Sequence, residues 1–460
     1  MLEISGNYCK DIKVFTDDIE PTAVETLHRI SDNKGYEGVK MRLMPDVHQG
    51  VGDTLIGMSY AVDIDNGMIN VDSVGCDLGC SVSLTFFDRP IPTDKIVEFE
   101  HKIKREIPFG YYINEGLFWD KKELMKMMNL ALDRLVARYP QFAPFCEFRF
   151  KDDRDVGSWL KKLRMDEKTY YRSIPSIGNG NHFVEYDSND ELGKYGVCVH
   201  CGSRNLGQKV FKYWSDIANN SDMPKQMQKE LIARIKDECK DDHYKIEDRL
   251  KEEKDKWRAT RISGFLNGDN MKKYLIDVLL CQVYASFNHK EIHKKIKEIY
   301  KKVCGGEPTD FINTTHNYVD YDYDSSDGRR MVMVRKGAVR SYKNERLIIP
   351  FNMRDGLSIC EGKSNEDWLF TAPHGCGRIM SRAVAKESLS VDEFKKTMSD
   401  NGVYTTTADV GTLDEAPMAY KPMEEIVKFI EPTVDILYMM KPKINIKGTD
   451  DKPWKKKKEG

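Results

Sequence analysis

Several residues of this chain have the side chains and neighbours that metal chemistry requires. The run Val74–Cys80 places Asp77 three residues before Cys80. A carboxylate oxygen, a thiolate sulfur and imidazole nitrogens form a mixed set of hard and soft ligands, which suits Mn, Zn or Fe better than Mg or Ca. The histidines that could complete such a set, and so hold two divalent ions, are His182, His200, His316 and His374.

The neighbours of these histidines indicate phosphate chemistry. Each histidine stands beside or near Gly, Asn or Arg, in the runs 178–183, 197–204, 315–317 and 373–378. Glycine lets backbone N–H groups approach an anion, and arginine binds phosphate oxygens in a planar fork. Any one of these histidines could be a structural residue, but four such settings with an Asp-x-x-Cys favour a shared metal site.

Five other histidines lie in charged, helix-like stretches. We expect them to be solvated surface residues: His28, His101, His243, His289 and His293.

Eight short motifs, in order from about residue 40 to residue 448, resemble the signature of RtcB-type RNA ligases. One such motif is a weak pattern, whereas eight in order are highly specific. The motifs are Met44–Gly50, Asp77–Cys80, Gly180–Phe183, His200–Arg204, Arg335–Ala338, His374–Arg378, Glu415–Lys421 and Ile446–Gly448.

The resemblance implies a nucleophile and a ligand set. In RtcB-type ligases the histidine of the His-Gly-x-Gly-Arg motif becomes bonded to GMP, which here is His374. Cys80 is the natural bridge between two ions, because a thiolate has lone pairs for both. Which imidazole binds which ion stays open. The implied ligands of two Mn ions are Asp77, Cys80, His182, His200 and His316.

The resemblance also implies a guanine pocket for GTP. Guanine needs an acceptor for its N1–H and amino groups, a donor for its carbonyl, and flat surfaces to stack on. The matching residues are Glu185, Lys447, Phe183 and Tyr420, although both aromatic residues could instead belong to the core. Residues that match phosphate contacts, or that hold ligands in place, are Asn181, Arg204, Asn317, Lys336 and Arg378.

The chain departs from the family pattern at 350–358. Family members usually carry a Gly-Ser-Met-Gly-Thr-like run here, whereas this chain reads Pro-Phe-Asn-Met-Arg-Asp-Gly-Leu-Ser. Asn352 could replace a hydroxyl contact to the nucleotide, and Ser358 could still serve. Cys76, Cys201 and Cys376 are further departures, and nearby thiols could make the site prone to oxidation. Because every expected ligand is kept, the pattern predicts a divergent but active member.

Composition agrees with a soluble cytoplasmic enzyme. The formal net charge is −2, so RNA contacts must come from a local basic patch rather than from the whole chain. Eleven cysteines without a regular framework, one of them needed as a thiolate, favour a reducing compartment. No stretch approaches the roughly 20 apolar residues of a membrane span.

The pattern of residues predicts an α+β fold: a β-rich mixed-sheet core that carries the metal site, surrounded by helices. Residues 1 to about 95 are predicted to form short strands and turns. Residues 94–140 and 210–303 have helical periodicity. The second helical block interleaves Lys with Glu, which favours an exposed face over an RNA-guiding surface. The run 372–383 is predicted to be a glycine turn that enters a helix, whose N-terminus would favour a phosphate.

We expect one catalytic domain over residues 1–448 and a basic tail over 449–460. The tail is predicted to be disordered, with a weak RNA-holding arm as the alternative.

The activity that the resemblance implies is GTP- and Mn-dependent ligation of RNA, in RNA repair or tRNA splicing. RNA ends with a 3′-phosphate or a 2′,3′-cyclic phosphate would be joined to 5′-hydroxyl ends, with a small archease-type protein as an activating partner. Two alternatives stay open. One is a metal-dependent cyclic phosphodiesterase that does not ligate, and the other is a non-catalytic RNA-binding paralogue.

Overall fold

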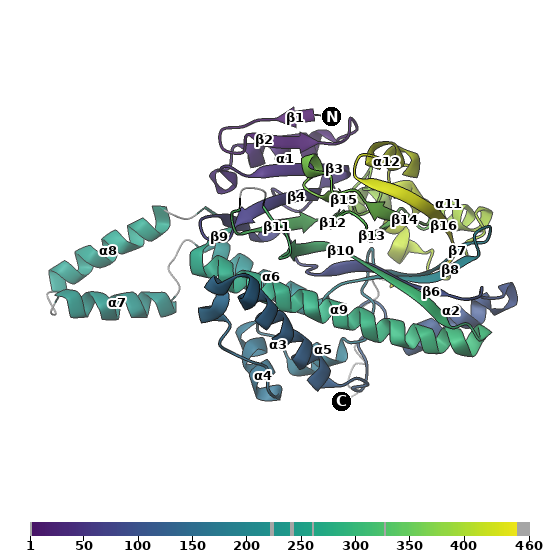
Figure 1. The fold of residues 1–460 in the computed structure, drawn as a ribbon, viewed down its shortest axis with the longest axis horizontal. Helices are drawn as coiled ribbons and strands as arrows, with labels where there is room; N and C mark the ends of the chain where they lie inside the picture. Colours follow the sequence, from purple (N-terminus) through teal and green to yellow (C-terminus); the bar gives the residue numbers. More distant parts are fainter. Residues whose placement is uncertain (1, 221–224, 240–242, 260–261, 326–327, 449–460) are drawn as a thin grey trace.

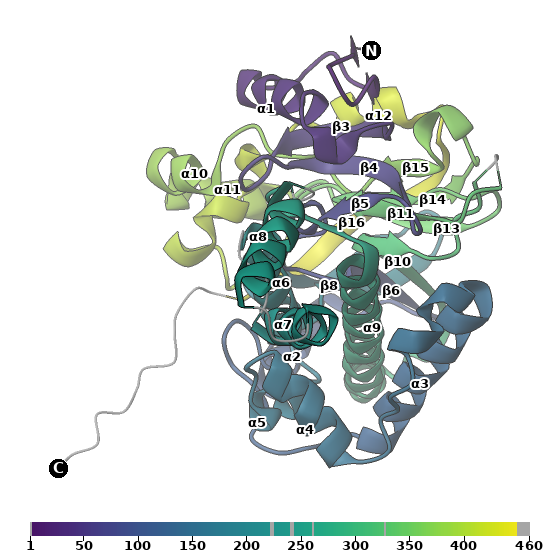
Figure 2. The same ribbon diagram turned by 90° about the vertical axis from the view of Figure 1, so that its left-hand side faces the viewer.

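The structure is a computed structural model that describes residues 2–220, 225–239, 243–259, 262–325 and 328–448. The tail predicted over 449–460 lies outside these residues. The centre of the molecule is one large mixed sheet of twelve strands, flanked by helices (Figures 1 and 2). This architecture confirms the predicted α+β fold.

The large sheet is antiparallel throughout except where β2 pairs with β3. In spatial order its strands are β1 (Leu2–Ile4), β2 (Asp11–Val14), β3 (Lys40–Gln49), β4 (Leu55–Asp63), β11 (Met331–Lys336), β10 (Pro308–Asp320), β6 (Cys80–Phe87), β8 (Lys194–Cys201), β7 (Phe183–Asn189), β16 (Val434–Lys447), β14 (Leu357–Gly362) and β13 (Arg346–Pro350). Two smaller sheets pair β12 (Ala338–Arg340) with β15 (Thr371–Pro373), and β5 (Met68–Asn70) with β9 (Phe265–Asn267).

Helices α2 to α6 and the long α9 gather along one side of the large sheet, whereas α10, α11 and α12 lie near its other parts (Figures 1 and 2). Helices α7 and α8 form a pair that extends away from the body (Figure 1). The helices are α1 (Pro21–Ser31), α2 (Ile96–Glu106), α3 (Lys121–Arg138), α4 (Asp153–Lys162), α5 (Glu167–Arg172), α6 (Arg204–Asn219), α7 (Lys225–Cys239), α8 (His243–Ala259), α9 (Gly268–Cys304), α10 (Arg382–Ser388), α11 (Val391–Asp400) and α12 (Met423–Ile430).

Strand β6 is buried along its whole length because both of its faces are covered. Val82, Leu84 and Phe86 point to one face and join an apolar cluster with residues of β13, β14 and β16. The intervening Ser83 and Thr85 point to the other face, which is covered by α9. This alternation follows the two-residue period of a strand, and it fixes which side of β6 carries the site.

Two histidines of α9 contradict the sequence interpretation. His289 and His293 were expected on the surface, but both side chains are 2% exposed. The Ser83 hydroxyl lies 2.5 Å from Nδ1 of His289 and 2.7 Å from Nε2 of His293, and Thr85 Oγ1 lies 2.8 Å from Nδ1 of His293. The prediction was wrong because the many lysines of α9 make the whole stretch look solvent-exposed. His289 and His293 are four residues apart, so they lie together on the inward face of the helix.

The structure confirms some of the other local predictions and corrects others. His28 and His101 are exposed, as predicted, and the side chain of His243 lies outside the described residues. The region 1–95 contains the helix α1 as well as strands and turns. In the run 372–383 the helix α10 begins only at Arg382, so the glycine turn does not lead directly into it.

None of the helices over the described residues combines the length and apolar character needed to cross a bilayer.

Candidate metal centre and nucleotide pocket

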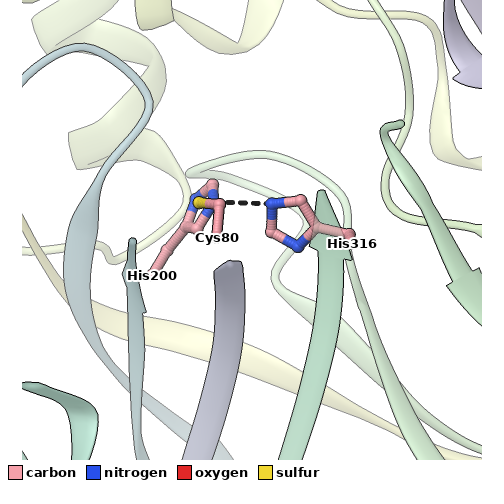
Figure 3. A group of neighbouring side chains, drawn as sticks. All are labelled: Cys80, His200 and His316. Atoms are coloured by element: carbon pink, nitrogen blue, oxygen red, sulfur yellow. Dashed lines mark hydrogen bonds between the residues drawn. The ribbon is translucent and has the colours of Figure 1, made fainter. Parts of the chain in front are cut away.

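The five expected ligands meet at one end of neighbouring strands. Cys80 is the first residue of β6, which lies between β10 and β8 in the sheet. His316 comes from β10 and His200 from β8, while Asp77 and His182 lie in the loops just before β6 and β7. Figure 3 shows Cys80 and His200 close together, with the ring of His316 facing them. Antiparallel pairing of three strands thus gathers side chains that are far apart in the sequence.

These residues form two groups that share one sulfur atom. Within each group, all the candidate ligand atoms lie within 4.8 Å of one another. Cys80 Sγ lies 3.1 Å from His200 Nε2, which in turn lies 3.1 Å from His316 Nε2. On its other side Cys80 Sγ lies 3.4 Å from His182 Nε2, and that atom lies 2.9 Å from Asp77 Oδ2. The geometry therefore assigns His200 and His316 to one group and His182 to the other, an assignment that the sequence left open.

Gly79 allows the loop before Cys80 to pass close to α9. Its φ is +74°, and a Cβ atom there would lie 2.9 Å from the Cα atom of Gln282. Any other residue would be strained and would push the loop away from the helix.

The protonation of the cluster suits a divalent cation. Burial lowers the pKa of His200 and His316 well below the ordinary value, so both rings are neutral at physiological pH and keep a lone pair. Burial disfavours the charged form of Asp77, but attraction to His182 and a hydrogen bond from it outweigh burial and lower its pKa to about 2. Burial raises the pKa of the Cys80 thiol, an effect that a cation bound to the sulfur would offset. This mixed set of hard and soft donors suits divalent transition-metal ions.

A backbone contact fixes the orientation of one ligand. His200 Nδ1 lies 3.1 Å from the carbonyl oxygen of Asn181 and donates its hydrogen there. The lone pair of the ring is then on Nε2, which faces Cys80 and His316. Such contacts behind a ligand set its tautomer, and here the backbone of Asn181 makes the contact.

His374 lies beside the cluster and is held by a buried carboxylate. Its Nδ1 lies 2.6 Å from Asp46 Oδ2, which also accepts the backbone N–H groups of His374 at 3.0 Å and Gly375 at 3.2 Å. Asp46 is fully buried, and the ring of His374 lies 5.2 Å from the ring of His316 between centroids. Since Nδ1–H donates to Asp46, the lone pair of His374 is on Nε2, and an imidazole nitrogen in this state has the chemistry of a nucleophile.

A cavity of about 570 Å³ opens over His200, His316 and His374. This volume falls in the range of small-molecule sites in proteins. Its lining includes seven of the residues that the sequence assigned to nucleotide or phosphate: Asn181, Phe183, Glu185, Asn352, Arg378, Tyr420 and Lys447.

A charged cluster forms one wall of this cavity. Lys447 Nζ lies 3.2 Å from Glu415 Oε2 and 5.2 Å from the centre of the Phe183 ring. Tyr420 donates its hydroxyl to the same carboxylate at 2.6 Å. Burial alone would raise the pKa of Glu415, but Lys447, Arg382 and other cations hold it well below the ordinary value. Glu415 is therefore ionised and fixes the cations and the tyrosine around it.

Comparison with known proteins identifies the family. The profile described as tRNA-splicing ligase RtcB matches residues 30–448. This chain belongs to the RtcB family.

Its relatives in the RtcB family come from bacteria, archaea and eukaryotes. The chain is 26% identical to the RNA-splicing ligase RtcB of Escherichia coli K12 over 422 residues, which cover 88% of this chain and 89% of that protein. It is 24% identical to the tRNA-splicing ligase RtcB of Archaeoglobus fulgidus, with 90% and 88% covered. It is 23% identical to RNA-splicing ligase RtcB homolog 2 of Entamoeba dispar, with 89% and 81% covered.

Four residues that the RtcB resemblance assigned to nucleotide or phosphate are not part of the described cavity lining. Arg204 donates to Ser176 Oγ at 2.9 Å and to the carbonyl oxygen of Gly110 at 2.6 Å, and Asn317 Oδ1 accepts the N–H of Gly337 at 2.8 Å. Both residues therefore support backbone near the ligands. The other two also contact the protein interior: Lys336 lies beside the turn at Gly75, and Ser358 is buried in β14 near the carbonyl of Ile349.

The loop that departs from the RtcB pattern satisfies its own polar groups. Asn352 Oδ1 accepts the backbone N–H groups of Arg354 and Asp355, at 3.0 and 3.1 Å. Asn352 Nδ2 donates to Asp355 Oδ2 at 2.7 Å, and Arg354 pairs with the same carboxylate. Asn352 lines the cavity, yet both ends of its amide are engaged within the turn.

Sequence reasoning missed two residues of the site. Asp46 and Glu415 stand inside motifs that were recognised, but neither was given a role. Asp46 and His374 are 328 positions apart, so their contact could not be deduced from spacing. The sequence feature that could have indicated them is that each is an acidic residue inside a recognised motif.

Proposed function

We propose that this chain is a GTP- and Mn-dependent RNA ligase that acts through a covalent histidine–GMP intermediate. One observation carries the proposal. In a member of the RtcB family, Asp46 leaves the lone pair of His374 on Nε2, and the ring of His374 lies 5.2 Å from the ring of His316, which belongs to one of the two candidate metal groups that share Cys80. A nucleophile of this kind needs cations that draw charge from a phosphate, and the donor set supplies the places for them.

The first step loads His374. The Nε2 lone pair attacks the α-phosphorus of GTP, a nitrogen–phosphorus bond forms, and the bond to the bridging oxygen breaks so that pyrophosphate leaves. Asp46 holds the proton on Nδ1 throughout and stabilises the positive charge that develops on the ring.

The later steps join RNA. An oxygen of an RNA 3′-phosphate attacks the bound phosphorus, and the electron pair of the broken bond returns to His374. The 5′-hydroxyl of a second strand then attacks the terminal RNA phosphorus, GMP leaves, and the hydroxyl proton passes to solvent. A 2′,3′-cyclic phosphate is first opened by water to a 3′-phosphate.

Two Mn ions are proposed in the two groups, one held by Cys80, His200 and His316 and the other by Asp77, Cys80 and His182. Bound ions would neutralise phosphate oxygens next to His374. In the cavity, Glu185 accepts from guanine, Lys447 donates to its carbonyl, and Phe183 and Tyr420 flank the base.

The proposal also covers the RNA substrates, the partner protein and the cellular compartment. The substrates are RNA ends produced in tRNA splicing or RNA damage, and a small archease-type protein is the proposed activator. All eleven cysteines are unpaired, which agrees with a reducing cytoplasm.

Incubation with labelled GTP and Mn, followed by denaturing electrophoresis, tests the proposal. We expect label that stays with the protein band and is released by acid. Two other outcomes would replace the proposal. Opening of cyclic phosphates without label would indicate a phosphodiesterase, and RNA binding without label or turnover would indicate a non-catalytic paralogue.

Replacing Asp46 with Asn should slow adduct formation strongly. An amide oxygen at this position can still accept from Nδ1–H and from the two backbone N–H groups, but it lacks the negative charge that stabilises the positive ring as Nε2 attacks. We expect the rate of labelling to fall on the order of 100-fold or more. Rapid-quench labelling at saturating GTP measures it, and bound metal should stay constant. An unchanged rate would remove Asp46 from the mechanism.

Replacing Glu185 with Ala should reduce the preference for guanine. The carboxylate accepts two hydrogen bonds from guanine but opposes the N1 acceptor of adenine. We expect kcat/KM for GTP to fall about tenfold or more and the ratio of GTP to ATP use to narrow. Glu191→Ala, an exposed change beyond the same strand, is the matched control. Equal use of GTP and ATP by the unaltered protein would mean that the guanine pocket does not transfer to this chain.

A further inference from the structure

Strand β7 carries a second acidic residue directly behind the wall of the cavity. Glu185 and Asp187 are two positions apart and point to the same face of the sheet, and they are 2% and 0% exposed. Glu185 lines the cavity, whereas Asp187 is fully buried and is not among the described lining residues. The mechanism above uses only the first of these two carboxyl groups.

The residues paired with Asp187 on the two neighbouring strands offer its carboxyl group no side-chain donor. Its partners across the sheet are Gly196 on β8 and Pro442 on β16, and neither has a polar side chain. Among the residues that the structure describes, neither oxygen of Asp187 has a hydrogen-bond partner. An ionised carboxylate buried in this way would be very unfavourable, so Asp187 must carry a proton or share one.

Glu185 is the acceptor within reach of that proton. Side chains two residues apart on one strand lie next to each other on the same face, and burial together with the charge of Glu185 raises the pKa of Asp187 well above its ordinary value. Asn445 Nδ2 donates to Oε2 of Glu185 from the neighbouring strand β16. Two carboxyl groups this close in a buried place cannot both be ionised, and a single shared proton resolves the conflict.

The other charged and titratable groups nearby do not remove this requirement. Lys447 on β16 is the cation that acts on Glu185, but it is already paired with Glu415 at 3.2 Å. Cys198 on β8 stands opposite Glu185, and burial keeps its thiol protonated. One negative charge on the pair of carboxyl groups is therefore what the surroundings can stabilise.

We propose that Asp187 is a positioning residue for base recognition: it shares one proton with Glu185 and thereby fixes Glu185 as the acceptor that faces the cavity. The inference rests on the proposed function, since it assigns a guanine base to this cavity. The O–H of Asp187 and the N–H of Asn445 hold the Glu185 carboxylate from behind. The remaining lone pairs of the Glu185 carboxylate are directed to the base.

Two substitutions separate this role from simple filling of the core. Asp187→Asn keeps a donor to Glu185, because an amide N–H replaces the shared proton. Asp187→Leu keeps the volume but removes the donor. We expect Asp187→Asn to keep the KM for GTP within about twofold, and Asp187→Leu to raise it about tenfold with a smaller change in kcat. The preference for GTP over ITP, which lacks the amino group, should be lost only in Asp187→Leu.

Infrared spectroscopy of the nucleotide-free protein reads the proton itself. At neutral pH we expect the band of a protonated carboxylic acid, which disappears in Asp187→Asn and shifts in Glu185→Gln. Thermal unfolding shows whether Asp187→Leu folds. If it does not, the infrared band and its loss in Asp187→Asn decide whether Asp187 shares a proton with Glu185.

The two proposals fail in different ways. If GTP neither binds nor labels the protein, the proposed function fails, while a carboxylic-acid band lost in Asp187→Asn would still establish the shared proton. Absence of that band, or the same GTP kinetics in Asp187→Leu and Asp187→Asn, would overturn the role of Asp187.

Discussion

His374→Ala yields no GMP-labelled protein, whatever the concentration of GTP or Mn. The reason is chemical: the imidazole supplies the only lone pair that the proposed mechanism uses to attack the α-phosphorus, and alanine has none. Denaturing electrophoresis after incubation with labelled GTP measures the loss, which we expect to be complete.

Two controls make this result specific to the nucleophile. His101→Ala removes an exposed histidine on α2 and should label normally. Bound metal in His374→Ala should stay near the level of the unaltered protein, because His374 belongs to neither candidate ligand group. Label that persists in His374→Ala would assign the adduct to another residue.

Cys80→Ala should lose bound metal and activity together. Its sulfur belongs to both ligand groups, so its removal takes a ligand from each and leaves two cations facing each other with less shielding. We expect the loss of at least one ion per chain after dialysis, and adduct formation below detection. Elemental analysis of the dialysed protein gives the metal content.

The matched control for this cysteine is Cys76→Ala. Cys76 is exposed in the same loop and belongs to neither group, so its replacement should change metal content and labelling little. Equal losses from the two variants would mean that the bridging cysteine is misassigned.

The sequence marked the residues that the structure brings together, whereas it did not show which of them pair with one another. Short motifs marked Cys80, His200 and His316, because each stands in an unusual run of polar and small residues. Their division into two groups depends on β6 lying between β10 and β8, and a sheet order of this kind is set by contacts over more than a hundred positions. No local pattern encodes it.

Burial was the second quantity that the sequence concealed. His289 and His293 stand among lysines, so their stretch resembles a solvated helix, yet α9 turns them toward the serine and threonine of β6. Ser358 is a further case. It was assigned to the nucleotide by its place in the run 350–358, which departs from the family pattern, but its side chain is buried near the carbonyl of Ile349. The alternation of inward and outward residues decides both cases, and it depends on the partner strand or helix.

A single-turnover chase tests the central claim most directly. Protein labelled with GMP is separated from free GTP and mixed with two RNA strands, one ending in a 3′-phosphate and the other beginning with a 5′-hydroxyl. The account predicts that label leaves His374, that joined RNA appears, and that GMP is released in the same amount as new RNA bonds. Failure of the protein to become labelled, or labelled protein that never transfers GMP and leaves both strands unjoined, would contradict it.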